Sequence, residues 1–151
     1  MATAITLTTD FGTADGYVGA MKGVISDIAP HAQIHDLTHD IPAQDVRAAA
    51  FALYRAVPFY PPGSVHCVVI DPGVGTARLP LAVLAVDRQY LVGPDSGVFS
   101  LFCPPFVDAE PAAVALTESR WWRTREAPSA TFHGRDLFAP VAAHLARLIE
   151  T

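Results

Sequence analysis

The chain has 151 residues, enough for one domain with its own hydrophobic core. Its composition is 51% hydrophobic and its formal net charge is −5, which excludes disordered and fibrous proteins. Basic residues are few and scattered, so no nucleic-acid partner is expected. No apolar run reaches the ~18 residues of a membrane span, and the first residues lack the basic start of a signal peptide.

The two cysteines, Cys67 and Cys103, lie far apart in apolar surroundings. Free buried thiols are a simpler interpretation of this pattern than a disulfide or a redox pair. A cytoplasmic location is expected on this ground.

The first half of the chain predicts two strands and two helices. Residues Ile5 to Thr9 are β-branched and predict a short strand. Apolar residues at helical spacing predict a helix from Tyr17 to Ile28, which Pro30 ends. A second short strand is expected from Gln33 to Leu37 and a second helix from Asp45 to Val57.

The second half predicts mainly strands, followed by a final helix. Residues Val65 to Ile70 form a continuous apolar run, as in a strand that is covered on both faces. The other expected elements are strands at Leu81–Val86 and Gln89–Val92 that pair across Asp87-Arg88, a short helix at Ser96–Phe102, a strand at Ala113–Leu116 and a last helix from Asp136 to about Ile149.

The alternation of strands and helices predicts a single three-layer α/β/α domain with a mostly parallel central sheet, spanning residues 1–151. In such sheets, ligands bind beyond the carboxyl ends of the strands. Two carboxylates occupy that place, because Asp10 follows the first strand and Asp71 follows the apolar central one. Asp10 suits a diol such as that of ribose, but capping of the following helix is an equal alternative.

The segment DPGVGTAR, residues 71–78, follows the central strand. It is neither a P-loop nor a dinucleotide-binding fingerprint. Its glycines would let the backbone approach a ligand, and Arg78 could fold back onto Asp71 and hold it charged. An ordinary turn with an ion pair explains the same residues, so both readings stay open.

A third polar cluster is TFHGRD, residues 131–136. Asp136 suits an N-cap of the last helix and Arg135 suits solvent, whereas His133 has no evident structural role. A single histidine is more often structural than catalytic. A further set, His31, His35 and His39, does not predict a metal site, because an extended segment spreads these side chains apart.

Longer motifs make the chain recognisable. In order, they are TTDFG, DGYVGAMKGVI, DLTHDIPAQDVRAAAFAL, FYPPGSVHCVVIDPGVGTAR, LVGPDSGVFS and TFHGRDLFAPVAAHLA. Together they resemble the N-terminal domain of the S-adenosyl-L-methionine (SAM) hydroxide adenosyltransferases, adenosine-forming SAM hydrolases related to fluorinase and chlorinase. The resemblance covers nearly the whole chain.

The resemblance implies a reaction in which water or hydroxide attacks the ribose 5′ carbon of SAM, releasing methionine and forming adenosine. It implies no metal, no other cofactor and no partner besides SAM and further copies of the chain in a homotrimer. Family members continue into a C-terminal β domain, which holds much of the SAM bound by a neighbouring subunit. That domain is not found in these 151 residues, so an inactive binding or assembly domain is the alternative.

The resemblance also implies roles for particular residues. It places a catalytic set on Asp71, Arg78 and His133, the ribose-diol carboxylate on Asp10, and a carboxylate near the methionine ammonium on Asp15. A polar contact from Gln44 is a weaker expectation.

The related fluorinase has a tyrosine at the position of Asp71 and Tyr-Ser at the positions of His133-Gly134, where the serine helps to bind halide. A carboxylate beside a halide would repel it. Asp71 and Gly134 therefore favour a hydrolase over a halogenase.

Overall fold

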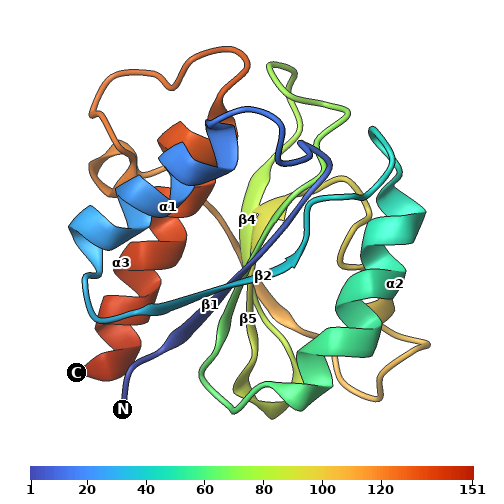
Figure 1. Ribbon diagram of the computed structural model, residues 1–151. Helices are drawn as coiled ribbons and strands as arrows, with labels where there is room; N and C mark the ends of the chain where they lie inside the picture. Colours follow the sequence, from blue (N-terminus) through green and yellow to red (C-terminus); the bar gives the residue numbers. More distant parts are fainter.

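A six-stranded sheet runs through the centre of the molecule (Figure 1). The structure is a computed structural model and describes all residues, 1–151. The strands lie side by side in the order β2-β1-β3-β5-β4-β6. Their bounds are β1 Ala4–Thr9, β2 Gln33–Thr38, β3 Val65–Val69, β4 Pro80–Leu84, β5 Tyr90–Pro94 and β6 Ala112–Ala115.

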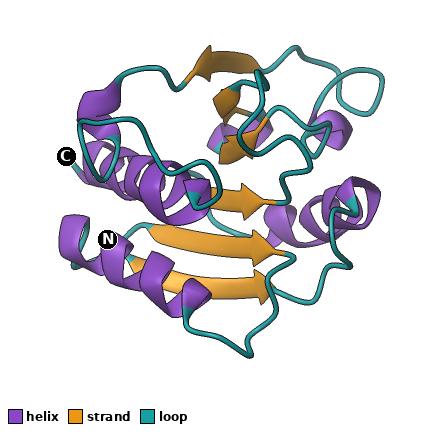
Figure 2. Cartoon of the chain, turned by 90° about the horizontal axis from the view of Figure 1, so that it is seen from above, coloured by secondary structure: helices purple, strands orange, loops and turns teal.

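Three α-helices pack on the sheet: α1 (Tyr17–Ile28), α2 (Val46–Ala56) and α3 (Ala139–Glu150). Helices α1 and α3 lie side by side on one face, and α2 lies on the other (Figures 1 and 2). The predicted α/β domain with a mostly parallel sheet is confirmed. The helices all fall short of the length and hydropathy that a membrane span requires.

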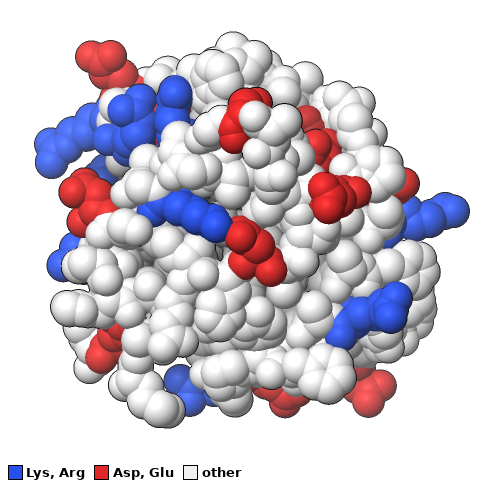
Figure 3. Space-filling view, viewed as in Figure 1, with Lys and Arg blue, Asp and Glu red and all other residues white.

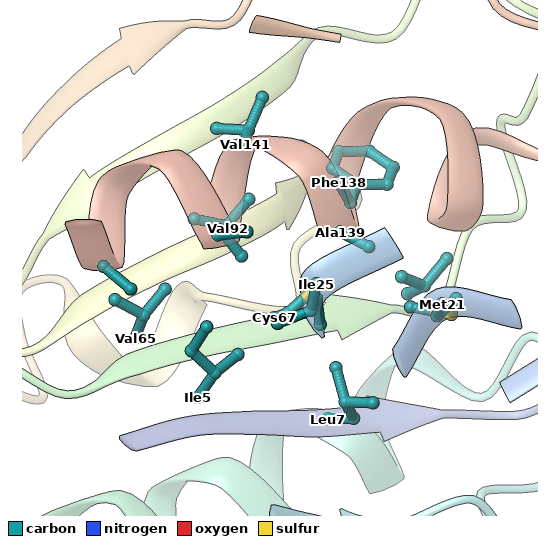
Figure 4. Close-up of a cluster of buried hydrophobic side chains, with 14 of the residues drawn as sticks. Ile5, Leu7, Met21, Ile25, Val65, Cys67, Val92, Phe138, Ala139 and Val141 are labelled. Atoms are coloured by element: carbon teal, nitrogen blue, oxygen red, sulfur yellow. The ribbon is translucent and has the colours of Figure 1, made fainter. Parts of the chain in front are cut away.

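The core under α1 and α3 follows from the sequence pattern. On α1, Val18, Met21 and Ile25 are buried, at the helical spacing that predicted this helix. All three belong to one core cluster with Ile5 and Leu7 of β1. Figure 4 shows Met21 and Ile25 beside these strand side chains. Complete burial of such side chains stabilises the fold by about 1.5–3 kcal/mol each.

The direction of the strands places several loops at one edge of the sheet. Strands β2, β1, β3 and β5 run parallel, and β4 and β5 form the predicted antiparallel pair. Because these strands are parallel, the loops that follow β1, β2 and β3 emerge together at the carboxyl edge.

The β4–β5 turn contains Asp87 and Arg88, both with positive φ (56° and 57°).

Two predicted helices differ from the structure. Only Ser100–Phe102 of the expected Ser96–Phe102 helix is helical, as one 3₁₀ turn. The last helix is preceded by a π-helical turn, η5 (Gly134–Phe138), and Asp136 lies inside that turn. Asp136 is therefore not the N-cap that the sequence predicted. Apolar residues at α-helical spacing do not predict a π turn, because the extra residue of the turn shifts the apolar pattern by one position.

Charged side chains are spread over the face seen in Figure 3, with one gathering of basic groups at its upper left. This gathering lies over the loop between β6 and η5, which contains Arg120, Arg123 and Arg125. Elsewhere on this face acidic and basic groups are both present, and several acidic groups lie near one another at the upper right.

A buried histidine makes the stability of the fold depend on pH. His66, on β3, is fully buried; its Nδ1 lies 2.7 Å from Thr6 Oγ1 and its Nε2 lies 3.0 Å from Gln89 Oε1. Burial lowers the pKa of His66, and the Gln89 hydrogen bond opposes this only partly. Below the ordinary histidine pKa of ~6.5, the unfolded chain therefore binds a proton that the folded chain does not.

We expect the free energy of unfolding to fall as the pH drops below ~6.5, because the unfolded state is protonated first. Denaturant midpoints at pH 7.5 and 5.5 measure this dependence. His66→Gln should reduce the difference between the two midpoints. His31→Gln, at an exposed histidine, should leave it unchanged. An equal pH dependence in the parent and His66→Gln would contradict the assignment to His66.

Candidate active site

A small polar pocket lies at the carboxyl edge of the sheet, with a cavity volume of about 180 Å³. Its walls come from the loops after β1, β2 and β3 and from the segment that enters η5. The lining residues are Asp10, Phe11, Gln44, Val69, Asp71, Val74, Thr131, His133 and Gly134. Asp10, Asp71 and His133, from three separate sequence motifs, thus share one pocket.

Asp71, Arg78 and His133 form one hydrogen-bonded group. Arg78 folds back so that its Nε donates to Asp71 Oδ1 at 2.9 Å and its Nη2 donates to Asp71 Oδ2. The same Nη2 lies 2.7 Å from Nδ1 of His133. The side chains of Asp71 and Arg78 are only 6% and 11% exposed, so this two-point ion pair is shielded from solvent.

Two neighbouring residues allow the Arg78 side chain to fold back onto Asp71. A Cβ atom on Gly73 would lie 2.8 Å from Cγ of Arg78, so any side chain at position 73 would displace the arginine. On the other side, the guanidinium lies 5.4 Å from the ring centroid of Phe138, which is fully buried. This is cation–π range, and it ties the arginine to the core.

The hydrogen bond from Arg78 determines the proton position on His133. A guanidinium only donates, so Nδ1 must accept and Nε2 carries the proton of the neutral ring. Burial and the positive charge of Arg78 lower the pKa of His133, while Asp71 and the Ser129 backbone oppose them. His133 is therefore neutral at pH 7, and its exchangeable proton lies on Nε2.

Asp136 fastens the loop that precedes His133. Its carboxylate accepts hydrogen bonds from Arg123 Nε (2.7 Å), Arg135 Nε (2.8 Å) and the Ser129 backbone N–H (3.3 Å). Burial alone would raise the pKa of Asp136, but these hydrogen bonds outweigh it and hold the pKa far below its ordinary value. The arginine that was expected in solvent, Arg135, is thus part of this loop anchor.

Asp10 is held from one side only. Its Oδ2 accepts a hydrogen bond from the backbone N–H of Gln44 at 2.7 Å, while Oδ1 has no partner in the chain and Asp10 lines the pocket. Gln44 has a φ of 61°, in the left-handed region that non-glycine residues rarely adopt. The sequence predicted a polar contact from Gln44 without specifying the atoms; in the structure its backbone N–H binds Asp10, and such a backbone contact has no sequence signature.

Asp15 lies apart from the other candidate residues. Its Oδ1 accepts a hydrogen bond from the backbone N–H of Tyr17 at 3.0 Å, at the start of α1. The side chain is exposed and does not line the pocket. Its predicted place beside a methionine ammonium stays a prediction.

Position 134 is tightly packed against α1. A Cβ atom there would lie 3.1 Å from Tyr17 Oη and 3.3 Å from Met21 Sδ. Tyr17 is itself fixed, since its Oη accepts a hydrogen bond from the Arg135 backbone N–H at 3.1 Å. A serine at this position would require the ends of the Tyr17 and Met21 side chains to move by a few tenths of an ångström.

We expect Gly134→Ala to destabilise the chain by about 1–3 kcal/mol, because overpacking a tight contact forces neighbouring groups to shift. Denaturant unfolding measures the change. Gly19→Ala is the matched control, since a Cβ there meets nothing within 4 Å, and it should be neutral or stabilising. Equal stability of the two variants would contradict the packing argument.

A larger cavity of about 570 Å³ lies at the opposite, amino edge of the sheet. It is lined by the 3₁₀ turn η1 (Val57–Phe59) and by the β4–β5 turn, among other residues. It contains no histidine and no carboxylate–arginine–histidine group. The smaller pocket is therefore the better candidate for chemistry.

Comparison with known proteins agrees with the geometry. Residues 5–151 match the family described as the SAM hydroxide adenosyltransferase N-terminal domain. The chain belongs to this family. It is 50% identical to the (R)-S-adenosyl-L-methionine hydrolase of Salinispora arenicola over 94% of this chain and 52% of that protein. The hydrolase of Thermus thermophilus is 47% identical, over 91% and 54% respectively.

A more distant relative and a solved structure are also similar to this chain. A fluorinase from an Actinoplanes species is 26% identical over 94% of this chain and 54% of that protein. The crystal structure of an uncharacterized conserved protein from Thermotoga maritima superposes with a TM-score of 0.89 at 41% identity, covering 95% of this chain and 54% of the other. The chain thus spans about half the length of the family members it matches.

Proposed function

We propose that this chain hydrolyses SAM to adenosine and L-methionine by attack of water or hydroxide on the ribose 5′ carbon. The contact of Asp71, Arg78 and His133 at the pocket wall carries the proposal. The names of the relatives support it, since several at 42–50% identity are called (R)-S-adenosyl-L-methionine hydrolases. The reaction uses SAM and water alone, with no metal or redox cofactor.

The chemical demand falls on the nucleophile. The sulfonium of SAM is already a good leaving group, so the protein must position water in line with the C5′–S bond. Water has a pKa of ~15.7, and its activation is the harder part of the reaction. A carboxylate that accepts from water and a cation that stabilises hydroxide character, as Asp71 and Arg78 provide, address that demand.

We assign the three side chains different tasks. Asp71 orients and polarises the water and takes up its proton as the C5′–O bond forms and the C5′–S bond breaks, since each carboxylate oxygen keeps a lone pair beyond its bond to Arg78. Arg78 stabilises the developing hydroxide. His133 acts as a hydrogen-bond donor through Nε2–H, because its Nδ1 already accepts from Arg78.

The size of the pocket limits what this chain encloses. Sites for small molecules usually measure ~300–1,000 Å³, and this one measures about 180 Å³. We propose that it holds the ribose and the nucleophile, with the diol on Asp10. The adenine and methionine ends of SAM would be covered by the C-terminal β domain of a neighbouring subunit in a homotrimer, as the family resemblance implies.

Hydrolysis in H₂¹⁸O tests the proposal directly. The purified chain is incubated with SAM, the products are separated, and their molecular masses are measured by mass spectrometry. Attack at C5′ predicts equimolar adenosine and methionine, with the ¹⁸O label in adenosine alone. Label in another product, or no product from a folded chain, would overturn the proposal.

Two other functions give different outcomes in the same assay. An inactive binding or assembly domain would bind SAM or adenosine without product. A halogenase would consume SAM only with chloride or fluoride present. Asp71 at the pocket wall argues against the halogenase, because a carboxylate would repel a halide bound beside it.

A further inference from the structure

We propose that His39 is a positioning residue that holds Asp10 in place for the ribose diol. Asp36 in turn orients the His39 ring. The inference rests on the proposed function, because it gives a task to residues beside that site. His39 is 5% exposed and lies just beyond the end of β2, next to the end of β1. It makes no contact with the pocket itself.

The hydrogen bonds around His39 have only one consistent direction for a neutral ring. Nε2 lies 2.7 Å from Asp36 Oδ1, and a carboxylate only accepts, so Nε2 carries the proton. Nδ1 must then accept from the Thr9 hydroxyl, at 2.7 Å. This leaves the Thr9 oxygen free to accept from the Phe11 backbone N–H at 3.2 Å.

The backbone of His39 holds the same loop from its other end. The Gly12 N–H donates to the His39 carbonyl at 2.8 Å. Thr9 and Gly12, on either side of Asp10, are therefore both bound to one residue. Since Asp10 itself has a single hydrogen bond, to the Gln44 backbone, the direction of its free oxygen depends on this loop.

The strand pairing brings His39 to this position. The β1–β2 register shifts between Leu7 and Thr8, so that Leu7 pairs with Asp36 but Thr8 pairs with Thr38. Such an irregularity re-aims the side chains that follow it. Lys22 on α1 then holds Asp36, with Nζ donating to Oδ2 at 2.8 Å. The chain of contacts thus runs from a surface lysine to the loop that carries Asp10.

A second buried histidine on the same sheet provides an internal control. His66 also pairs with a β1 threonine, Thr6, at 2.7 Å, and it too is buried. Thr6 lies three residues before Thr9 and contacts nothing at the pocket. Loss of either histidine should reduce stability, but only loss of His39 should change recognition of the ribose.

The experiment compares His39→Leu, His39→Asn and His66→Asn. Calorimetry gives the dissociation constants for adenosine and 2′-deoxyadenosine, and steady-state kinetics gives kcat and KM for SAM. His39→Leu should weaken adenosine binding and raise KM by about 10- to 100-fold, the loss expected for one hydrogen bond to a charged group, with a smaller change in kcat. Its preference for adenosine over 2′-deoxyadenosine should disappear. His39→Asn, whose amide can still accept from Thr9, should recover part of both.

The two proposals fail differently. If the parent hydrolyses SAM and His39→Leu keeps the KM and the diol preference, the positioning role is wrong and the hydrolase stands. If the parent binds adenosine with a diol preference that His39→Leu removes, but forms no product, the hydrolase is wrong and the positioning role stands. An equal loss of the diol preference in His66→Asn would show that the His39 variants act through general loss of stability, and this would overturn the inference. A parent that neither binds adenosine nor forms product would overturn both.

Discussion

Asp71→Asn should lower kcat/KM for SAM hydrolysis by about 10²- to 10⁴-fold, the usual contribution of a side chain that polarises a reacting water. Asparagine keeps the size of the side chain but has one acceptor oxygen where the carboxylate has two. Arg78 donates to both oxygens of Asp71, so one of its donors would face an amide N–H. The expected loss of stability, about 1–3 kcal/mol, is small beside the loss of activity.

The assay follows adenosine by chromatography, and circular dichroism verifies that the variant is folded. Asp95→Asn is the matched control, because Asp95 follows β5 as Asp71 follows β3 but is exposed and lies outside the pocket. It should hydrolyse SAM like the parent. Equal turnover by Asp71→Asn and the parent would remove Asp71 from the mechanism and, with it, the proposed means of activating water.

Arg78→Met should both abolish turnover and destabilise the chain by about 3–5 kcal/mol, since it leaves a buried carboxylate without its partner. The Asp71 side chain is 6% exposed, so water from the pocket would replace the lost guanidinium only in part. The double variant Asp71→Asn/Arg78→Met should regain part of this stability, because the amide carries no charge.

Denaturant unfolding of both single variants and the double variant gives the interaction energy of the pair. Arg55→Met, at an exposed arginine on α2, is the control for the loss of a positive charge and should be nearly neutral. Additive effects of the two single variants would mean that the ion pair contributes nothing beyond its separate members. That result would contradict the shielded, two-point contact described above.

The fold could be predicted where local patterns determine it. Helix α1 has the predicted bounds because Val18, Met21 and Ile25 share one face and Pro30 follows its end. The antiparallel pairing of β4 and β5 was also predicted correctly. The start of α3 was wrong, since Asp136 lies inside a π turn and is held by Arg123, 13 residues before it, as well as by its neighbour Arg135.

The candidate site divides in the same way. The ionic contact of Asp71 with Arg78 was foreseen, because both side chains lie in one short loop and have opposite charge. Two further contacts were missed: that of Asp10 with a backbone N–H of Gln44, and that of His39 with Thr9. Neither pair is close in sequence. A possible signal was the clustering of polar residues at the ends of two neighbouring parallel strands, in TTD and THD.

Because of the π turn at Gly134–Phe138, the position of His133 depends on how many residues the turn contains as well as on which residues they are. An α-helix advances about 100° per residue, from 3.6 residues per turn. Deleting one residue from the turn would allow a regular helix and would rotate the segment before it by about that angle relative to α3. His133 would then leave Arg78, although every side chain of the site would still be encoded. A comparison of sequences by residue identity alone would score such a chain as nearly unchanged.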